Sequence, residues 1–176
     1  MEESKLQVLF TKIQIQERVD TLAGEISDYY MSRSEPVVAV CVLKGAFVFF
    51  ADLFRKLQFQ PEIDFVRLAS YGNKTYREEE VSCQKDLEVS IQGKHVLVVE
   101  DIVDTGNTVD YLMEKMKAKS PKSIKVCSLL HKGERKEVDV PVDFCGFYLE
   151  TGFVVGYGLD CAEKYRHLEE ICALVQ

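Results

Sequence analysis

The sequence lacks the features of a membrane-spanning or secreted protein. No apolar run approaches the roughly 20 residues that an α-helix needs to cross a bilayer, because Lys44 and Asp52 interrupt the longest candidates. The first residues, MEESKLQVLF, are acidic and do not show the basic and then apolar pattern of a secretory signal. We therefore expect a cytoplasmic protein that has no membrane partner.

Cysteine pairs are also missing. Six cysteines are present, but none forms a Cys-x-x-Cys pair and none has a spacing to histidine that suits zinc. Cys41, Cys127 and Cys172 lie inside apolar runs. We expect the cysteines to be small buried side chains rather than disulfides or metal ligands.

Positive charge is in short supply. Lysine and arginine together number 22 against 29 acidic residues, which gives a net charge of −7. Nucleic-acid binding needs a basic face that neutralises phosphates, so we expect no nucleic-acid partner. A small anion remains possible, because local backbone N–H groups or a bridging metal ion can hold it.

What the sequence does contain is an alternation of apolar strands and amphipathic helices. The chain has 176 residues, 47% of them hydrophobic, which suits one domain with its own core. Strands are expected at 36–43, 63–69, 95–100 and 122–130, and helices at 14–31, 46–57 and 106–118. Strands that are apolar throughout and separated by helices predict an α/β fold with a mostly parallel sheet. From about residue 140, glycines interrupt short strands, and we expect a smaller subdomain beside the sheet.

The stretch VLVVEDIVDTGNT, residues 96–108, places two acids at the end of a buried strand. In open parallel sheets, ligands bind at the carboxyl ends of the strands. Glu100 and Asp101 would repel each other there unless a cation or hydroxyl donors bridged them. Mg²⁺ suits such oxygen ligands, and so does the vicinal diol of a ribose.

The residues that follow these acids open a helix. A helix N-terminus offers free backbone N–H groups and a positive dipole end, which together favour an anion. Gly106 allows the backbone to approach a ligand, and Thr105 and Thr108 add hydroxyl donors. The spacing and the lysine of a Walker P-loop are absent. A simpler interpretation is that Asp104 or Thr105 only caps the helix.

Residues 96–108 resemble the phosphoribosyl-pyrophosphate signature of the type I phosphoribosyltransferases, and the EDIVDTG part is most similar to the hypoxanthine–guanine members. Residues 38–53, 64–72, 125–132 and 153–168 resemble the same family in the same order, so the likeness covers nearly the whole chain. It implies the type I phosphoribosyltransferase fold for one domain, 1–176. The core would be about 36–131, and a small hood would combine the N-terminal segment with about 140–176.

The resemblance also implies an activity. The family transfers the 5-phosphoribosyl group from 5-phosphoribosyl-1-pyrophosphate to a purine, uses Mg²⁺ and releases pyrophosphate. The expected enzyme is a purine-salvage hypoxanthine phosphoribosyltransferase that also accepts guanine and forms IMP and GMP. Its partners would be these small molecules and further copies of the chain, in a homodimer or homotetramer whose interface includes the apolar segment 46–50.

Site roles follow from the same resemblance. Asp104 would be the general base near the purine N7. The 5′-phosphate and ribose would contact Glu100, Asp101, Asp104, Thr105, Gly106, Asn107 and Thr108. Pyrophosphate would contact Lys44, Gly45, Ser70, Tyr71 and Arg166, with Ser70 and Tyr71 beginning a catalytic lid. The purine would contact Lys132, Phe153, Val154 and Asp160. The metal ligands would be Glu100, Asp101 and Asp160.

Three features depart from the family pattern, and two alternative functions also stay open. The lid segment KTYREEE replaces a tip that is rich in small residues, Gly152 stands where many relatives have lysine, and Cys161 stands where an aromatic residue commonly follows the aspartate. A xanthine-preferring enzyme is one alternative. A regulator that senses phosphoribosyl pyrophosphate and binds nucleic acid is another, but it usually needs a basic surface or an added domain.

Overall fold

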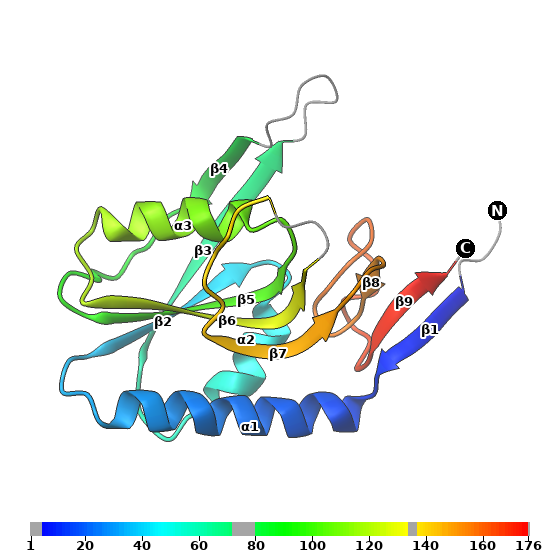
Figure 1. The fold of residues 1–176 in the computed structure, drawn as a ribbon, viewed down its shortest axis with the longest axis horizontal. Helices are drawn as coiled ribbons and strands as arrows, with labels where there is room; N and C mark the ends of the chain where they lie inside the picture. The colour runs from blue at the N-terminus through cyan, green and yellow to red at the C-terminus, as the bar shows by residue number, and fades with distance from the viewer. Residues whose placement is uncertain (1–4, 72–79, 134–136, 176) are drawn as a thin grey trace.

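A computed structural model describes residues 5–71, 80–133 and 137–175 (Figure 1). Along the chain the elements are β1 (Lys5–Phe10), α1 (Lys12–Met31), β2 (Val37–Leu43), α2 (Phe47–Phe54), β3 (Glu62–Tyr71), β4 (Glu80–Lys85), β5 (His95–Val103), α3 (Asn107–Lys117), β6 (Ser123–Lys132), β7 (Phe144–Leu149), β8 (Val154–Val155) and β9 (Ile171–Val175). The main sheet has the order β4-β3-β2-β5-β6-β7. All its pairs are parallel except β3–β4, so the predicted α/β fold is confirmed.

The first helix, α1, shows why the sequence forms these elements where it does. Thr11 is its N-cap, and the Thr11 and Gln14 side chains bond each other's backbone N–H groups in a capping box. The buried side chains of α1 recur at helical spacing, from Ile15 through Val19 and Leu22 to Ile26. This stripe packs on the sheet, as the periodicity predicted.

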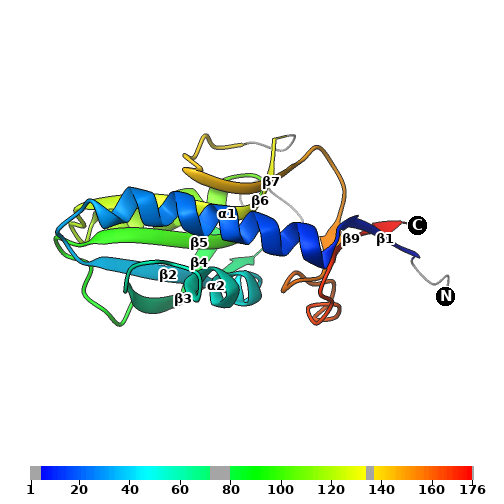
Figure 2. The same ribbon diagram turned by 90° about the horizontal axis from the view of Figure 1, so that it is seen from below.

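The central strands are apolar throughout because helices cover both faces of the sheet, with α3 on one face (Figure 1) and α1 and α2 on the other (Figure 2). On one face, Ala39 and Cys41 of β2 pack in a cluster with residues of α1 and α2. On the other face, Val38 and Val40 pack in a cluster with residues of α3. Alternate residues of one strand therefore belong to two different cores.

A three-stranded antiparallel sheet, β1-β9-β8, joins the N-terminal segment to the last part of the chain. β7, which lies in the part of the chain expected for the hood, pairs with β6 in the main sheet. Gly146 lies within β7, and a Cβ there would lie 2.3 Å from the Leu129 carbonyl oxygen. This glycine permits close strand packing and does not interrupt the strand.

The parallel strands place their carboxyl ends at one edge of the sheet. The chain runs from β2 to β3 on one side of β2, whereas β5 pairs on its other side. This reversal is a topological switch point, where α/β sheets commonly bind ligands. Residues 44–45 and 100–101 flank it.

Cys41, Cys127, Cys145 and Cys172 are buried and free, as predicted, whereas Cys83 and Cys161 are free but only partly buried. None of the helices in the described residues has the length and apolar character needed to cross a bilayer.

Candidate active site

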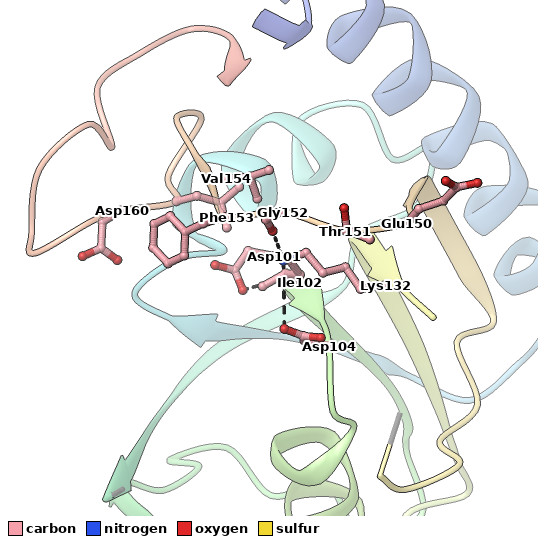
Figure 3. Close-up of a pocket in the computed structure, with 11 residues that line it drawn as sticks. Asp101, Ile102, Asp104, Lys132, Glu150, Thr151, Gly152, Phe153, Val154 and Asp160 are labelled. Atoms are coloured by element: carbon pink, nitrogen blue, oxygen red, sulfur yellow. Dashed lines mark hydrogen bonds and ion pairs between the residues drawn. The ribbon is translucent and has the colours of Figure 1, made fainter. Parts of the chain in front are cut away.

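A cavity of about 470 Å³ lies at the carboxyl edge of the sheet, between the ends of β5 and β6 and the segment that follows β7 (Figure 3). Asp160 and Glu150 lie at its opposite ends. The cavity is lined by Asp101, Ile102, Asp104, Lys132, Glu150, Thr151, Gly152, Phe153, Val154, Leu159 and Asp160. The structure therefore brings together the predicted purine-contacting residues, the predicted general base and one of the paired acids.

Lys132 connects two walls of this cavity. Its Nζ atom donates a hydrogen bond of 2.6 Å to the Gly152 carbonyl oxygen and lies 3.9 Å from Oδ2 of Asp104. Only 11% of the Lys132 side chain is exposed, against 31% for Asp104. The other carboxylate oxygen of Asp104, Oδ1, is buried and has no hydrogen-bond partner among the described residues. Asp104 thus presents an acceptor without a partner next to a cation.

Phe153 is an exposed aromatic residue that lines this cavity. Its relative accessibility is 54%, whereas the next residue, Val154, is buried as the start of β8. A large apolar ring left open beside polar groups suits stacking on a planar ligand better than a role in the core.

The paired acids Glu100 and Asp101 lie in β5. Asp101 N–H donates to Oε1 of Glu100 at 3.1 Å, and Ile102 N–H donates to Oδ1 of Asp101 at 2.8 Å. Oε2 of Glu100 is buried without a hydrogen-bond partner in the described part of the chain. Burial and the neighbouring negative charge raise the pKa of Glu100, and burial raises the pKa of Asp101. A cation or hydroxyl donors would favour the ionised pair.

The loop of residues 104–108 begins α3 in the way an anion site requires. Its helix N-cap is Gly106, with φ +89° and no side-chain cap, and the Thr105 hydroxyl oxygen accepts the N–H of Asn107 at 3.4 Å. A Cβ on Gly106 would lie 2.5 Å from the carbonyl oxygen of Val138. The backbone N–H groups of the first turn have no intrahelical partners and point out of the helix end.

A second segment fixes this loop, and sequence reasoning did not identify it. The N–H groups of Glu137 and Val138 both donate to the Thr105 carbonyl oxygen at 3.0 Å. The Asn107 side-chain amide donates to Oε2 of Glu137 at 2.8 Å. Asn107 is therefore held by Glu137, an exposed acid that belongs to no recognisable sequence motif.

Lys44 and Arg166 approach the site from two other elements. The Leu43–Lys44 peptide is cis, and Lys44 Nζ lies 2.8 Å from Oε1 of Glu163. Arg166 bonds the Gly158 carbonyl oxygen and lies 2.8 Å from Oδ1 of Asp160. The hydrogen bond from Lys44, and to a smaller extent the one from Arg166, lowers the pKa of Glu163 below its usual range. Glu163 was not predicted either, since an exposed glutamate has no sequence signal.

Ser70 and Tyr71 end β3 at the same edge of the sheet, where their backbones pair with Val81 and Glu80 of β4. The lid segment expected after them falls on residues 72–79, which lie outside the described residues. Ile102, Glu150, Thr151 and Leu159 line the cavity but were not singled out from the sequence.

Within the described residues, no group of three or more His, Cys, Asp or Glu side chains is arranged to hold a metal ion. Mg²⁺ often takes only one or two protein carboxylates, with water and substrate phosphates completing its shell. The Glu100–Asp101 pair, in which the buried Oε2 of Glu100 is unpartnered, fits that kind of site.

The chain is similar to known phosphoribosyltransferases over nearly its whole length. The family described as phosphoribosyl transferase domain matches residues 11–162. The hypoxanthine phosphoribosyltransferase of Salmonella typhimurium is 42% identical over 97% of this chain and 96% of its own length. The hypoxanthine-guanine-xanthine phosphoribosyltransferase of Tritrichomonas foetus is 42% identical over 93% and 88%. A crystal structure of a Bacillus anthracis hypoxanthine-guanine phosphoribosyltransferase superposes with a TM-score of 0.91 at 44% identity, covering 98% of this chain and 100% of that chain.

Proposed function

Because this chain belongs to the phosphoribosyltransferase family, we propose that it is the purine-salvage enzyme that transfers the 5-phosphoribosyl group from 5-phosphoribosyl-1-pyrophosphate to hypoxanthine and guanine. The products are IMP or GMP and pyrophosphate. The observation that supports this assignment best is the shared cavity in which Asp104, Lys132 and Phe153 meet from three separate elements. It offers a base, a hydrogen-bond donor and a stacking surface to one planar ligand.

The phosphoribosyl part of the substrate would bind across the start of α3. The backbone N–H groups and hydroxyls of Thr105, Gly106, Asn107 and Thr108 suit the 5′-phosphate, since the helix end carries a partial positive charge. Glu100 and Asp101 would accept hydrogen bonds from the ribose hydroxyls. These donors would also relieve the unfavourable burial of two adjacent carboxylates.

The acid pair is also the proposed place for Mg²⁺. Glu100 and Asp101 would hold one ion, and Asp160, which lines the same cavity as Asp101, would hold a second. Bound Mg²⁺ supplies a Lewis acid that neutralises the charge of the leaving pyrophosphate. Oxygen ligands from one or two carboxylates match the preference of this ion.

Pyrophosphate would leave toward a subsite formed by Lys44, Gly45 and Arg166, which we call the leaving-group subsite. Both cationic side chains face Glu163 at present. Ser70 and Tyr71 would contribute from the end of β3 and begin a lid. Closure would exclude water from a reactive sugar centre that water would otherwise trap.

The purine would lie between Phe153 and the end of β5, with Lys132 donating to its 6-oxo group. Val154 would read the edge of the base through its backbone. A donor at this position favours hypoxanthine and guanine over adenine, whose 6-amino group is itself a donor. In the transfer step, a purine ring nitrogen bonds to C1 of the ribose, the C1–O bond to pyrophosphate breaks, and Asp104 accepts the proton from N7.

A xanthine-preferring enzyme is the second candidate, because one relative is named for all three oxopurines. A spectrophotometric assay with phosphoribosyl pyrophosphate, Mg²⁺ and each of hypoxanthine, guanine, xanthine and adenine separates them. We expect turnover with hypoxanthine and guanine. Failure with every oxopurine would overturn the enzyme assignment, and a preference for xanthine would overturn the specificity. A nucleic-acid-binding regulator fits poorly with a net charge of −7.

The proposed setting is the cytoplasm, with the chain as a homodimer or homotetramer. Phe47, in the segment 46–50 expected at the interface, is 45% exposed. An exposed aromatic on a short helix is compatible with subunit contact. Sedimentation velocity would measure the number of subunits, and a monomer at all concentrations would contradict the proposal.

A further inference from the structure

Glu163 is a carboxylate placed between the two cations of the leaving-group subsite. Its Oε1 lies 2.8 Å from Nζ of Lys44, and its Oε2 lies 3.3 Å from Nη2 of Arg166. The two oxygens of one carboxylate thus bridge groups that come from the end of β2 and from the turn between β8 and β9. A phosphate group bridging Lys44 and Arg166 would have to occupy much of the same space.

The two cations depend on Glu163 to different degrees. Among the described residues, Glu163 is the only hydrogen-bond or ion-pair partner of the Lys44 ammonium group. Arg166 is anchored independently, through the Gly158 carbonyl oxygen and through Asp160, each at 2.8 Å. Removal of the Glu163 carboxylate would therefore free Lys44 but leave Arg166 in place.

The Glu163 side chain can leave this position without a change in its backbone. Its N–H group donates to Oδ2 of Asp160 at 2.8 Å, which fixes the turn. The side chain itself is 64% exposed, so rotation takes the carboxylate directly into solvent. Exposed ion pairs are weak, because water and salt screen them. A more highly charged anion would displace it readily.

We propose that Glu163 is a resident counter-ion of the leaving-group subsite, which holds Lys44 and Arg166 when the subsite is empty and is displaced by pyrophosphate. This inference rests on the proposed function. Glu163 competes with the diphosphate of the substrate and with the pyrophosphate product for the same cations. It therefore weakens product binding and favours product release.

The test compares Glu163→Gln and Glu163→Ala with the wild type in the intact enzyme. Loss of the competing charge should tighten the binding of pyrophosphate by about threefold to tenfold, since each exposed ion pair is worth up to roughly fivefold. Titration calorimetry with pyrophosphate and Mg²⁺ measures this directly. Product inhibition by pyrophosphate should strengthen by the same factor, and KM for phosphoribosyl pyrophosphate should fall while kcat does not rise.

Glu169→Gln is the matched control. Glu169 is an exposed glutamate in the same region that pairs with Lys12 instead, and its loss should leave pyrophosphate binding unchanged. Weaker or unchanged pyrophosphate binding in either Glu163 variant would overturn the counter-ion role. Absence of oxopurine turnover by the wild type would instead overturn the proposed function, so the two failures are distinguishable.

Discussion

Gly45 and Asp101 lie so close together that no side chain fits between them. An ideal Cβ built on Gly45 would stand 1.5 Å from Oδ2 of Asp101 and 2.5 Å from its Cγ. The Asp101 carboxylate is held from the other side, because its Oδ1 accepts the N–H of Ile102. The loop after β2 and the acid pair of β5 are thus in direct contact at the switch point of the sheet.

Gly45→Ala should impair activity much more than stability. The added methyl group must push the Asp101 carboxylate away from its present position, and displacement of a site group by about 1 Å can cost about 10²-fold in rate. We expect kcat/KM for phosphoribosyl pyrophosphate to fall by about 100-fold. The fold should tolerate the change, since the obstructing atoms are the end of a side chain. Steady-state kinetics and thermal unfolding test this, and an unchanged kcat/KM would contradict it.

Gly158→Ala, in contrast to Gly45→Ala, should cause a large loss of stability. A Cβ on Gly158 would lie 2.3 Å from the carbonyl oxygen of Gly45, which is backbone and cannot rotate away. The φ of Gly158 is +101°, a conformation that residues with side chains rarely adopt. We expect the free energy of unfolding to fall by about 2 to 4 kcal/mol, measured by urea denaturation.

Gly24→Ala is the matched control for that measurement. Gly24 lies inside α1, and a Cβ there would meet nothing within 4 Å. Alanine should therefore stabilise the helix by about 0.5 to 1 kcal/mol. A similar loss of stability in both variants would show that the contact between Gly158 and Gly45 has no specific effect.

The fold was predictable wherever a strand is buried on both faces. The run VVAVCVL of β2 is apolar at every position, which predicts a central strand. In the structure, helices pack on both of its faces. At β7 the sequence predicted a short strand but did not indicate its partner in the sheet. The close contact of Gly146 with the Leu129 carbonyl depends on that partner strand, which the sequence does not reveal.

The candidate site also has a part that could be predicted from the sequence and a part that could not. Residues 100–108 are contiguous, so their chemistry could be interpreted from local order alone. Glu137 and Glu163 could not be identified from the sequence. Glu137 contacts Asn107 and Glu163 contacts Lys44, and both acids come from turns that are distant along the chain. Only the folded chain brings these exposed acids to the site.

Asp64→Asn should make stability less dependent on pH. The Asp64 carboxylate is buried and accepts backbone N–H groups of Phe65, Glu88 and Val89 at 2.7 to 2.8 Å. Burial acts to raise its pKa, but these donors and Lys85 together lower it. A carboxylate with a lowered folded-state pKa stabilises the fold above its unfolded pKa of about 3.9, and this contribution is lost as the pH falls through the folded value.

At pH 7 the free energy of unfolding of the Asp64→Asn variant should therefore be about 2 to 3 kcal/mol lower than that of the wild type, because hydrogen bonds to a charged group are lost. The difference should shrink below about pH 4. Urea unfolding across pH values at which the wild type stays folded measures it. A difference that is constant with pH would mean that the charge of Asp64 does not contribute.

Asp104→Asn should lower kcat much more than it weakens phosphoribosyl-pyrophosphate binding. The amide keeps the shape of the carboxylate beside Lys132 but cannot accept the purine proton, so kcat should fall by about 10²- to 10⁴-fold. The phosphate would still meet the backbone N–H groups at the start of α3, and calorimetry should therefore find its affinity close to that of the wild type. Asp110→Asn is the matched control, because Asp110 lies in the first turn of the same helix but does not line the cavity. An unchanged kcat in Asp104→Asn would remove Asp104 from the role of general base, whereas an equal loss in both variants would point to the helix end instead.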